Sequence, residues 1–317
     1  MTLFRAIEIV ELTHRYGRRL ALEALTLSVE RGEIFAFLGP NGGGKTTLFR
    51  VLSTWAPVQQ GQVRVLGDPL PEAANAVRRR IGVVFQSPSL DRQLTVEENL
   101  RFQAALYGLS GRLLAERREE LLAQLGLTAR RSERVANLSG GLRRRVELAQ
   151  GMIHRPELLL MDEPSTGLDP GARSDLWTYL ERLRAEHQVT VALTTHLLEE
   201  AERADRIAIL NQGRLVALGS PESLKASIGG DSITIRSAGA EALREAIAQR
   251  FAIPVRLVDG ELHLEQPDGP RWIARLMDLF GDRIDSITLG RPSLADVFID
   301  KTGHRFWSEA SDEHRRE

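Results

Sequence analysis

The sequence has no cysteine, only three lysines, 5% aromatic residues and a net charge of −1. Without cysteine the chain can form neither a disulfide framework nor a thiolate metal site, which fits a reducing compartment. Its 42 basic and 43 acidic residues lack the broad basic excess of a dedicated nucleic-acid binder. No apolar run approaches the roughly 20 residues that span a bilayer, so we expect any work in a membrane to require another chain.

What the chain does have is ordinary globular composition. Its 317 residues are 42% hydrophobic and 27% charged, which predicts a folded protein rather than a disordered one. This length also leaves room for two domains.

The first 225 residues alternate between strand-like and helical patterns. Residues 87–155 follow mostly helical periodicity, with helices expected over 96–107 and 112–125 and another beginning just after Ser139. We therefore predict an α/β domain over residues 1–225 with a helical insertion at about 87–155. Short apolar or alternating runs predict its strands at residues 6–12, 25–29, 34–38, 158–161, 189–194, 207–210 and 214–218.

Residues 226–317 form a second pattern, which we assign to an accessory C-terminal domain. The expected order is a strand at 233–236, a helix at 240–251, a hairpin at 254–265, a helix at 270–280 and a strand at 283–289. This βαββαβ order is the ferredoxin-like arrangement. Residues 292–303 predict one more amphipathic helix.

A glycine-rich loop follows the expected strand at 34–38. The stretch GPNGGGKTT (residues 39–47) satisfies G-x-x-x-x-G-K-[ST], in which backbone N–H groups and the next helix's positive end hold phosphate oxygens. Lys45 is expected to reach the β and γ phosphates, and Thr46 to ligate Mg²⁺. A chance glycine turn is the alternative, but the order strand, loop, helix favours a nucleotide site.

Two carboxylates end the apolar run LLLMDEP. In open α/β sheets ligands collect at the carboxyl ends of strands, so Asp162 is placed to hold Mg²⁺ and Glu163 to polarise a water toward the γ phosphate. Taken alone, the pair would more often be a helix cap. Beside a phosphate-binding loop, we favour the catalytic interpretation.

The phrase LSGG precedes a strongly helical stretch. Ser139, Gly140 and Gly141 could simply be an N-cap and a turn, but they also make a second helix end that binds anions. One active site does not need two phosphate-binding segments, and the glycine-rich loop already supplies one. We therefore expect the cradle of one copy to complete the site of another.

With these motifs in this order, residues from about 5 to 225 resemble the nucleotide-binding subunit of an ATP-binding cassette (ABC) transporter. The resemblance implies a P-loop NTPase fold with a mixed-sheet core, an antiparallel β subdomain and a helical insertion. It implies ATP and Mg²⁺ as cofactors, and two cassettes arranged head to tail around two ATP molecules.

The same resemblance assigns roles to individual residues. It implies catalytic roles for Glu163, His196 and Gln86, and Mg²⁺ ligation by Thr46, Gln86 and Asp162. The nucleotide is expected to contact Tyr16, which matches the aromatic that stacks on adenine, and Gly39, Pro40, Asn41, Gly42, Gly43, Gly44, Lys45, Thr46, Thr47, Ser139, Gly140, Gly141 and Asp169.

Two positions depart from the family pattern. Gly43 stands where alanine or serine is more usual, which should add flexibility without removing a phosphate contact. Leu142 replaces the usual glutamine, which puts a peripheral nucleotide contact in doubt while leaving the cradle intact.

The ending RPSLADVFIDKTG resembles the close of cassette subunits similar to those that export anthracycline drugs and Nod factors. Such subunits pair with a separate membrane permease, so the resemblance implies export driven by ATP, with closure and reopening of the cassette pair moving the permease. It also favours a homodimer, although the sequence leaves open whether the two cassettes are identical. We expect the chain to be peripheral at the cytoplasmic face of the inner membrane, with no nucleic acid as partner.

Two alternatives share the motifs. A non-transport ABC ATPase of the translation type usually carries two cassettes in one chain, and the DNA-repair type splits its motifs around a long coiled coil; neither pattern is present. A regulatory ATP sensor without turnover is the other alternative, and the intact Glu163 and His196 argue against it.

Overall fold

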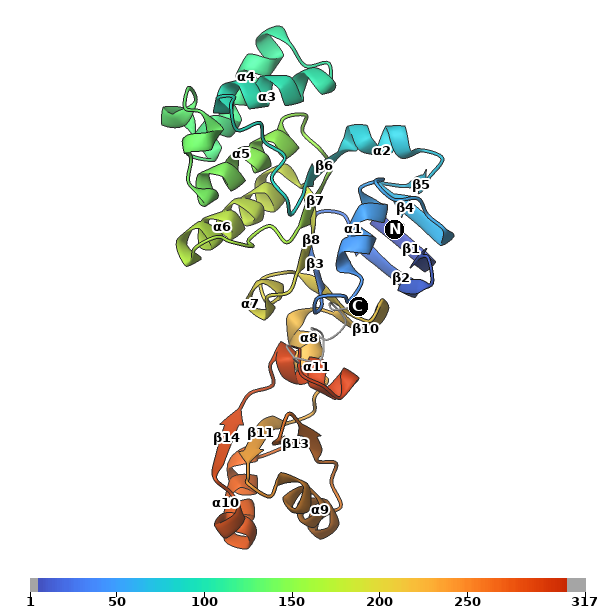
Figure 1. The fold of residues 1–317 in the computed structure, drawn as a ribbon, viewed down its shortest axis with the longest axis vertical. Coiled ribbons are helices and arrows are strands. Elements are labelled where there is room, and N and C mark those ends of the chain that lie inside the picture. The colour runs from blue at the N-terminus through green and yellow to red at the C-terminus, as the bar shows by residue number, and fades with distance from the viewer. Residues whose placement is uncertain (1–4, 307–317) are drawn as a thin grey trace.

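Three sheets organise residues 5–306, the part of the chain that the computed structural model describes. The helical insertion lies at one end of the elongated molecule and the C-terminal sheet at the other, with a six-stranded sheet between them (Figure 1). The six-stranded sheet has the order β10-β9-β3-β8-β7-β6, parallel except for the β10–β9 pair. Its strands are β3 (Ile34–Leu38), β6 (Ile81–Val84), β7 (Leu158–Asp162), β8 (Thr190–Thr195), β9 (Arg206–Asn211) and β10 (Arg214–Gly219).

Both faces of this central sheet are buried, which explains its continuous apolar runs. In β3, Ile34, Ala36 and Leu38 enter the core on one face, whereas Phe35 and Phe37 enter the core on the other. Successive side chains of a strand point to opposite faces, so a strand covered on both sides has no polar alternation.

One face of the central sheet packs against an antiparallel sheet of order β2-β1-β4-β5 and against α1 (Lys45–Leu52). These elements share a single apolar core, separate from the core on the opposite face. The strands of this sheet are β1 (Arg5–Tyr16), β2 (Arg19–Glu30), β4 (Gln60–Val65) and β5 (Asp68–Leu70), and α2 (Ala74–Arg80) leads from it into β6.

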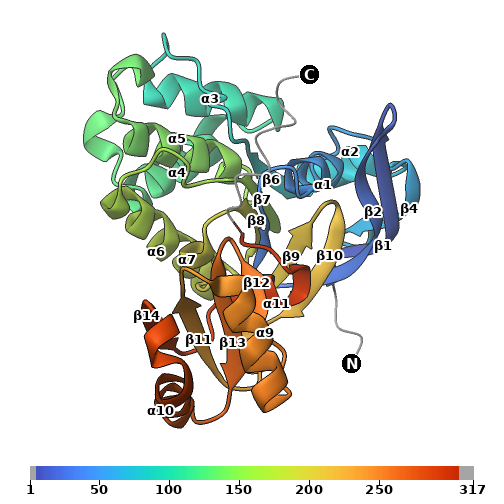
Figure 2. The ribbon, with the colours of Figure 1, turned by 60° about the horizontal axis from the view of Figure 1, so that its bottom comes forward.

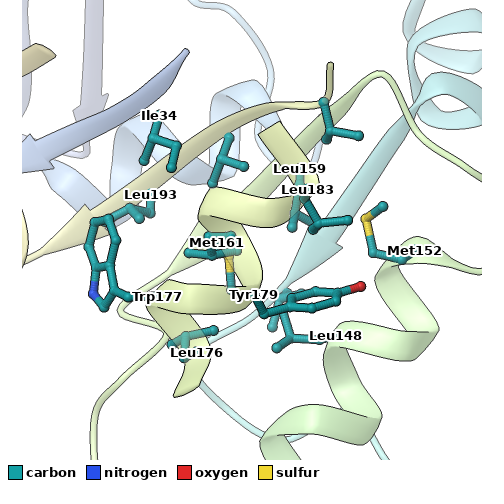
Figure 3. Close-up of a cluster of buried hydrophobic side chains, with 14 of the residues drawn as sticks. Ile34, Leu148, Met152, Leu159, Met161, Leu176, Trp177, Tyr179, Leu183 and Leu193 are labelled. Carbon is teal, nitrogen blue, oxygen red and sulfur yellow. The ribbon is translucent and has the colours of Figure 1, made fainter. Parts of the chain in front are cut away.

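The other face is covered by helices. Trp177 and Tyr179 of α6 (Pro170–His187) pack with Leu148 and Met152 of α5 (Gly140–Met152) against Met161 and its neighbours on β7 (Figure 3). Farther from the sheet lie α3 (Val96–Leu106) and α4 (Gly111–Gln124), whose apolar residues join the same core. Short helices α7 (Leu198–Ala201) and α8 (Pro221–Ala226) and 3₁₀ turns at Thr128–Arg130 and Val135–Asn137 complete this part.

The C-terminal sheet has the order β12-β13-β11-β14, entirely antiparallel, with its own small core. This is the strand order of a ferredoxin-like βαββαβ unit. Its elements are β11 (Asp231–Arg236), α9 (Ala240–Phe251), β12 (Arg256–Val258), β13 (Glu261–Gln266), α10 (Gly269–Phe280), a 3₁₀ turn at Gly281–Arg283 and β14 (Ser286–Gly290).

The last helix, α11 (Leu294–Thr302), links the two parts of the molecule. Its Phe298 is fully buried in the core that lies on the helical face of the central sheet. Its polar side holds the C-terminal sheet, because Asp296 accepts a hydrogen bond from Ser232 and Asp300 pairs with Arg256 at 2.5 Å. In Figure 2, α11 lies between the C-terminal sheet and the β9–β10 pair.

The predicted fold class is confirmed in its elements. The mixed sheet, the antiparallel sheet, the helical insertion and the ferredoxin-like unit are all present. The predicted hairpin turns at Asp259 and Gly260, both with positive φ, as a two-residue type I′ turn requires. The ranges predicted from the sequence leave out β4, β5, β6, α2, α6, α7 and α8, and the last strand begins at Ser286 rather than at residue 283.

Candidate functional site

The phosphate-binding loop joins β3 to α1, the strand–loop–helix order that the sequence predicts. Gly44 caps α1 with φ +101°, and a Cβ there would lie 2.8 Å from the carbonyl oxygen of Ala21. Only glycine fits this conformation and this close approach. At Gly39 close approach alone excludes a side chain, because a Cβ would lie 2.4 Å from the carbonyl oxygen of Leu210.

Lys45, the first residue of α1, is 4% exposed. Its Nζ donates to the carbonyl oxygens of Gly39 at 2.7 Å and Pro40 at 3.1 Å, and lies 3.5 Å from Oε1 of Glu163. Burial lowers the pKa of Lys45, and the nearby carboxylates of Glu163 and Asp162 oppose that shift. The ammonium group is therefore held against the phosphate loop.

Asp162 ends β7 and is almost completely buried. Burial raises the pKa of its carboxyl group, while a hydrogen bond from Thr194 Oγ1 to Oδ1, at 2.5 Å, acts in the opposite direction. A buried carboxylate of this kind gains from a cation beside it.

Glu163 has φ +44°, in the left-handed region that non-glycine residues rarely adopt. Its backbone N–H donates to both the carbonyl oxygen and Oγ1 of Thr194, at 3.2 and 3.0 Å, and these bonds hold the strained conformation. Its Oε2 accepts from Gln86 Nε2 at 3.2 Å and from Thr166 Oγ1 at 3.3 Å, and lies 3.0 Å from His196 Nδ1. Three polar groups thus surround one carboxylate oxygen.

The phosphate-binding loop, Lys45 and Glu163 line one cleft of about 500 Å³. The cleft brings together predicted residues that are far apart in the sequence, including Tyr16, which is 44% exposed at its rim. Arg19, Ala21 and Thr166 also line it, and the sequence analysis did not predict these three residues. The predicted residues on its walls are Tyr16, Pro40, Asn41, Gly42, Gly43, Gly44, Lys45, Thr46, Thr47, Gln86, Glu163 and His196.

Six predicted residues do not line this cleft: Gly39, Ser139, Gly140, Gly141, Asp162 and Asp169. Gly39 and Asp162 each directly precede a residue that does line it, whereas the other four lie elsewhere in the chain. Ser139 caps α5 by accepting from Leu142 N–H at 3.3 Å, and Asp169 caps α6 by accepting from Ala172 N–H at 2.9 Å. Ser139, Gly140 and Asp169 are exposed. Within one chain, the LSGG segment therefore does not contact the phosphate loop's cleft.

A buried arginine connects α5 to the cleft. Arg144 donates from Nε to the carbonyl oxygen of Pro164 at 2.7 Å and from Nη1 to that of Phe85 at 2.8 Å. Its charge is paired with buried Glu147 at 2.6 Å. Since Phe85 precedes Gln86 and Pro164 follows Glu163, one side chain supports both segments.

The fold and cleft define the chain as a P-loop nucleotide-binding cassette. A family model for the ABC transporter matches residues 22–166, and a model for the C-terminal domain of ATP-binding proteins like DrrA1-3 matches residues 219–302. The daunorubicin resistance ATP-binding protein DrrA2 of Streptomyces coeruleorubidus is 38% identical over 313 residues, covering 95% of this chain and 96% of that protein.

Two further proteins show the same likeness. The Nod factor export ATP-binding protein I of Bradyrhizobium diazoefficiens is 40% identical over 301 residues, covering 94% of this chain and 96% of that protein. A dimeric structure of a bacterial ABC transporter cassette superposes with a TM-score of 0.62 at 26% identity, covering 68% of this chain and 98% of that one.

The chain therefore belongs to the family of ABC transporter ATP-binding proteins with a DrrA-like C-terminal domain. It is an ATP-hydrolysing subunit of an ABC transporter, and the predicted family is confirmed. The comparisons do not support the translation, DNA-repair or sensor alternatives. No helix within residues 5–306 is both long and apolar enough to cross a membrane.

Proposed function

We propose that this chain powers export by a separate membrane permease, with Glu163 as the base that activates the attacking water. The observation that carries the proposal is the placement of Glu163 Oε2 against Gln86, Thr166 and His196 in the same cleft as Lys45 and the glycine loop. A carboxylate held by three polar groups beside a phosphate cradle suits in-line attack on a γ phosphate.

Each neighbour of Glu163 has a role in this reaction. Lys45 and the loop N–H groups hold the phosphates, while Gln86 and His196 orient the carboxylate and the water. Glu163 takes a proton from the water while the oxygen of the water bonds to the γ phosphorus. The bond between the γ phosphorus and the oxygen that bridges it to the β phosphate breaks, which gives ADP and phosphate. Tyr16, at the open rim, supplies a face for the adenine.

The donor set also fits Mg²⁺. The Thr46 hydroxyl, the Gln86 amide oxygen and the Asp162 carboxylate are the hard oxygen ligands that this ion prefers, and the burial that raises the pKa of Asp162 favours a cation beside it. When bound, the ion would neutralise charge on the β and γ phosphates.

The second half of the site would come from another cassette. Ser139, Gly140, Gly141 and Asp169 lie outside their own chain's cleft, and two of them cap helix N-termini, which attract anions. In a head-to-tail dimer of two copies they would close over the partner's ATP. A cassette structure to which this fold is similar is dimeric, which supports pairing of two cassettes.

Transport would follow from this dimer. ATP binds the closed dimer more tightly than the open one, and this difference drives closure, while hydrolysis allows reopening. We propose that the helical insertion docks on the permease and that residues 226–317 act as an accessory domain of the 1–225 cassette. The names of the relatives support export, which would place the chain peripherally on the cytoplasmic face of the cell membrane, without nucleic acid.

A Glu163→Gln variant tests the proposal. We expect ATP hydrolysis to fall by a factor of about 10² or more, since removing a positioned general base costs on that order, while ATP binding persists and an ATP-bound dimer accumulates. Glu157→Gln is the matched control, because Glu157 makes the same kind of ion pairs outside the cleft. Hydrolysis by Glu163→Gln at the parent rate would show that the base is wrongly assigned.

A further inference from the structure

The C-terminal sheet has one long free edge. β14 pairs with β11 on one side, and no described strand pairs with its other side. It lies on the outside of the C-terminal unit, at the end of the molecule away from the helical insertion (Figure 1). The opposite edge strand, β12, is only three residues long and is tied to α11 by the ion pair between Arg256 and Asp300. An exposed edge presents unpaired N–H and C=O groups and is a template for another strand.

We propose that β14 pairs antiparallel with β14 of a second copy of this chain, about a two-fold axis at Thr288. A two-fold axis perpendicular to the sheet would join the two four-stranded sheets into one sheet of eight strands, with the helices of both copies on one face. This contact is separate from the ATP sandwich and does not require nucleotide, so it goes beyond the proposed function.

Charge selects the register of this pairing. β14 itself, SITLG, is uncharged, but Asp285 precedes it and Arg291 follows it, and both are exposed. Neither side chain makes an ion pair within residues 5–306. With the axis at Thr288, Asp285 of each copy lies opposite Arg291 of the other, so two ion pairs form at once.

Two neighbouring registers also keep the helix-covered faces of both sheets on the same side, but they pair the charged residues less favourably. An axis at Ile287 would place Arg283 opposite Arg291, and like charges directly opposite each other on paired strands are destabilising. An axis at Leu289 would leave Arg291 opposite Ile287, with no charged partner. Shifts by a single residue would put the helix-covered face of one strand against the open face of the other.

Apolar residues continue the surface beside the edge. Leu289 of β14 is 37% exposed, and it lies opposite Ile287 of the other copy in the favoured register. α10 packs on β14 and β11 and exposes Met277 and Leu279, which are 43% and 50% accessible. Pairing of the edges would bring the α10 helices of the two copies nearer to each other.

The absence of cysteine allows a clean test by crosslinking. In a Thr288→Cys variant of the full chain, without nucleotide, the two introduced thiols would face each other across the axis, and we expect oxidation to give a covalent dimer. Ser286→Cys is the matched control: it lies on the same face two residues away, but its copies would be about 14 Å apart, so we expect at least tenfold less crosslinking. Equal crosslinking of the two variants overturns the proposal. So does a lack of crosslinking by Thr288→Cys, which is also the result expected if the permease covers this edge.

Charge reversal gives an independent measurement. Asp285→Arg and Arg291→Asp should each weaken the nucleotide-free dimer roughly tenfold in sedimentation experiments, and the double variant Asp285→Arg/Arg291→Asp should restore it. A monomeric parent chain, or a double variant as weak as the singles, contradicts the proposed register. All these residues lie outside the ATP cleft. A failure of the β14 pairing therefore leaves the assignment of Glu163 as the base untouched, and a failure of that assignment leaves the β14 pairing untouched.

Discussion

At the scale of single residues, the cleft depends on two backbone conformations that residues with a Cβ rarely adopt, and at Glu163 this conformation costs free energy. Glu163 and Gly44 both have positive φ, at +44° and +101°. Strain of this kind persists only where the surroundings impose it, and it occurs often at functional sites. At Glu163 the two hydrogen bonds to Thr194 impose it and direct the carboxylate toward Gln86 and His196.

A Gly44→Ala substitution tests the phosphate loop. The added Cβ would lie 2.8 Å from Ala21 O and 2.9 Å from Leu22 Cδ2, so the loop must move. We expect ATP affinity to fall at least tenfold in calorimetric titrations, and the free energy of unfolding to fall by about 1–3 kcal/mol. Gly17→Ala is the control, since Gly17 also has positive φ but open space around its Cβ. Equal effects on ATP affinity would show that close packing at Gly44 is unimportant.

At the scale of elements, α5 connects the LSGG segment to the catalytic cleft. Ser139 caps its N-terminus, and one turn later Arg144 reaches the carbonyl groups beside Gln86 and Glu163. A movement of α5, such as docking of a second cassette on LSGG would impose, therefore acts on both loops through one guanidinium.

Arg144→Met and the double variant Arg144→Met/Glu147→Met together separate the contribution of Arg144 to the stability of the fold from its contribution to ATP hydrolysis. The single variant leaves Glu147 buried without its partner, which costs about 3–5 kcal/mol of unfolding free energy. Arg144→Met/Glu147→Met should recover much of that stability, because an apolar pair replaces the buried ion pair.

We nevertheless expect the double variant to hydrolyse ATP roughly tenfold more slowly than the parent, since two hydrogen bonds to the cleft's loops are lost. Chemical denaturation and steady-state ATPase assays measure the two effects. Full activity in the double variant would show that Arg144 only stabilises the fold.

At the scale of the whole molecule, α11 makes the cassette and the C-terminal sheet depend on each other. Phe298 belongs to the cassette core. Its ring packs edge-on against the ring of Phe306, with 4.9 Å between the ring centroids. Asp296 and Asp300, on the same helix, hold β11 and β12. The last helix therefore completes the first part of the chain.

Phe298→Ala should accordingly destabilise the cassette, by about 3–5 kcal/mol as for other buried aromatic residues. Hydrogen exchange in β9, β10 and α8 should accelerate. Leu276→Ala, in the C-terminal core, is the control and should accelerate exchange mainly in β11 to β14. If hydrogen exchange in β9 and β10 of Phe298→Ala is as slow as in the parent chain, α11 does not support the cassette.

Much of the site could be predicted because its signals are local. The glycine loop, the carboxylates after an apolar strand and the LSGG cap are each complete within a few residues, and the central strands show as uninterrupted apolar runs because both of their faces are buried. The elements that were missed carry weaker patterns: β4 is largely exposed, and the amphipathicity of α6 is faint.

The sequence by itself thus determined the fold class, the nucleotide chemistry and the family, since strand periodicity, turn glycines and phosphate motifs act over short stretches of chain. Only the tertiary structure decided that Gln86, Glu163 and His196 meet around one oxygen, that Arg144 supports them, that α11 enters the cassette core and that β14 keeps a free edge. These features depend on contacts between residues tens of positions apart, which form only when the sheets pair and pack.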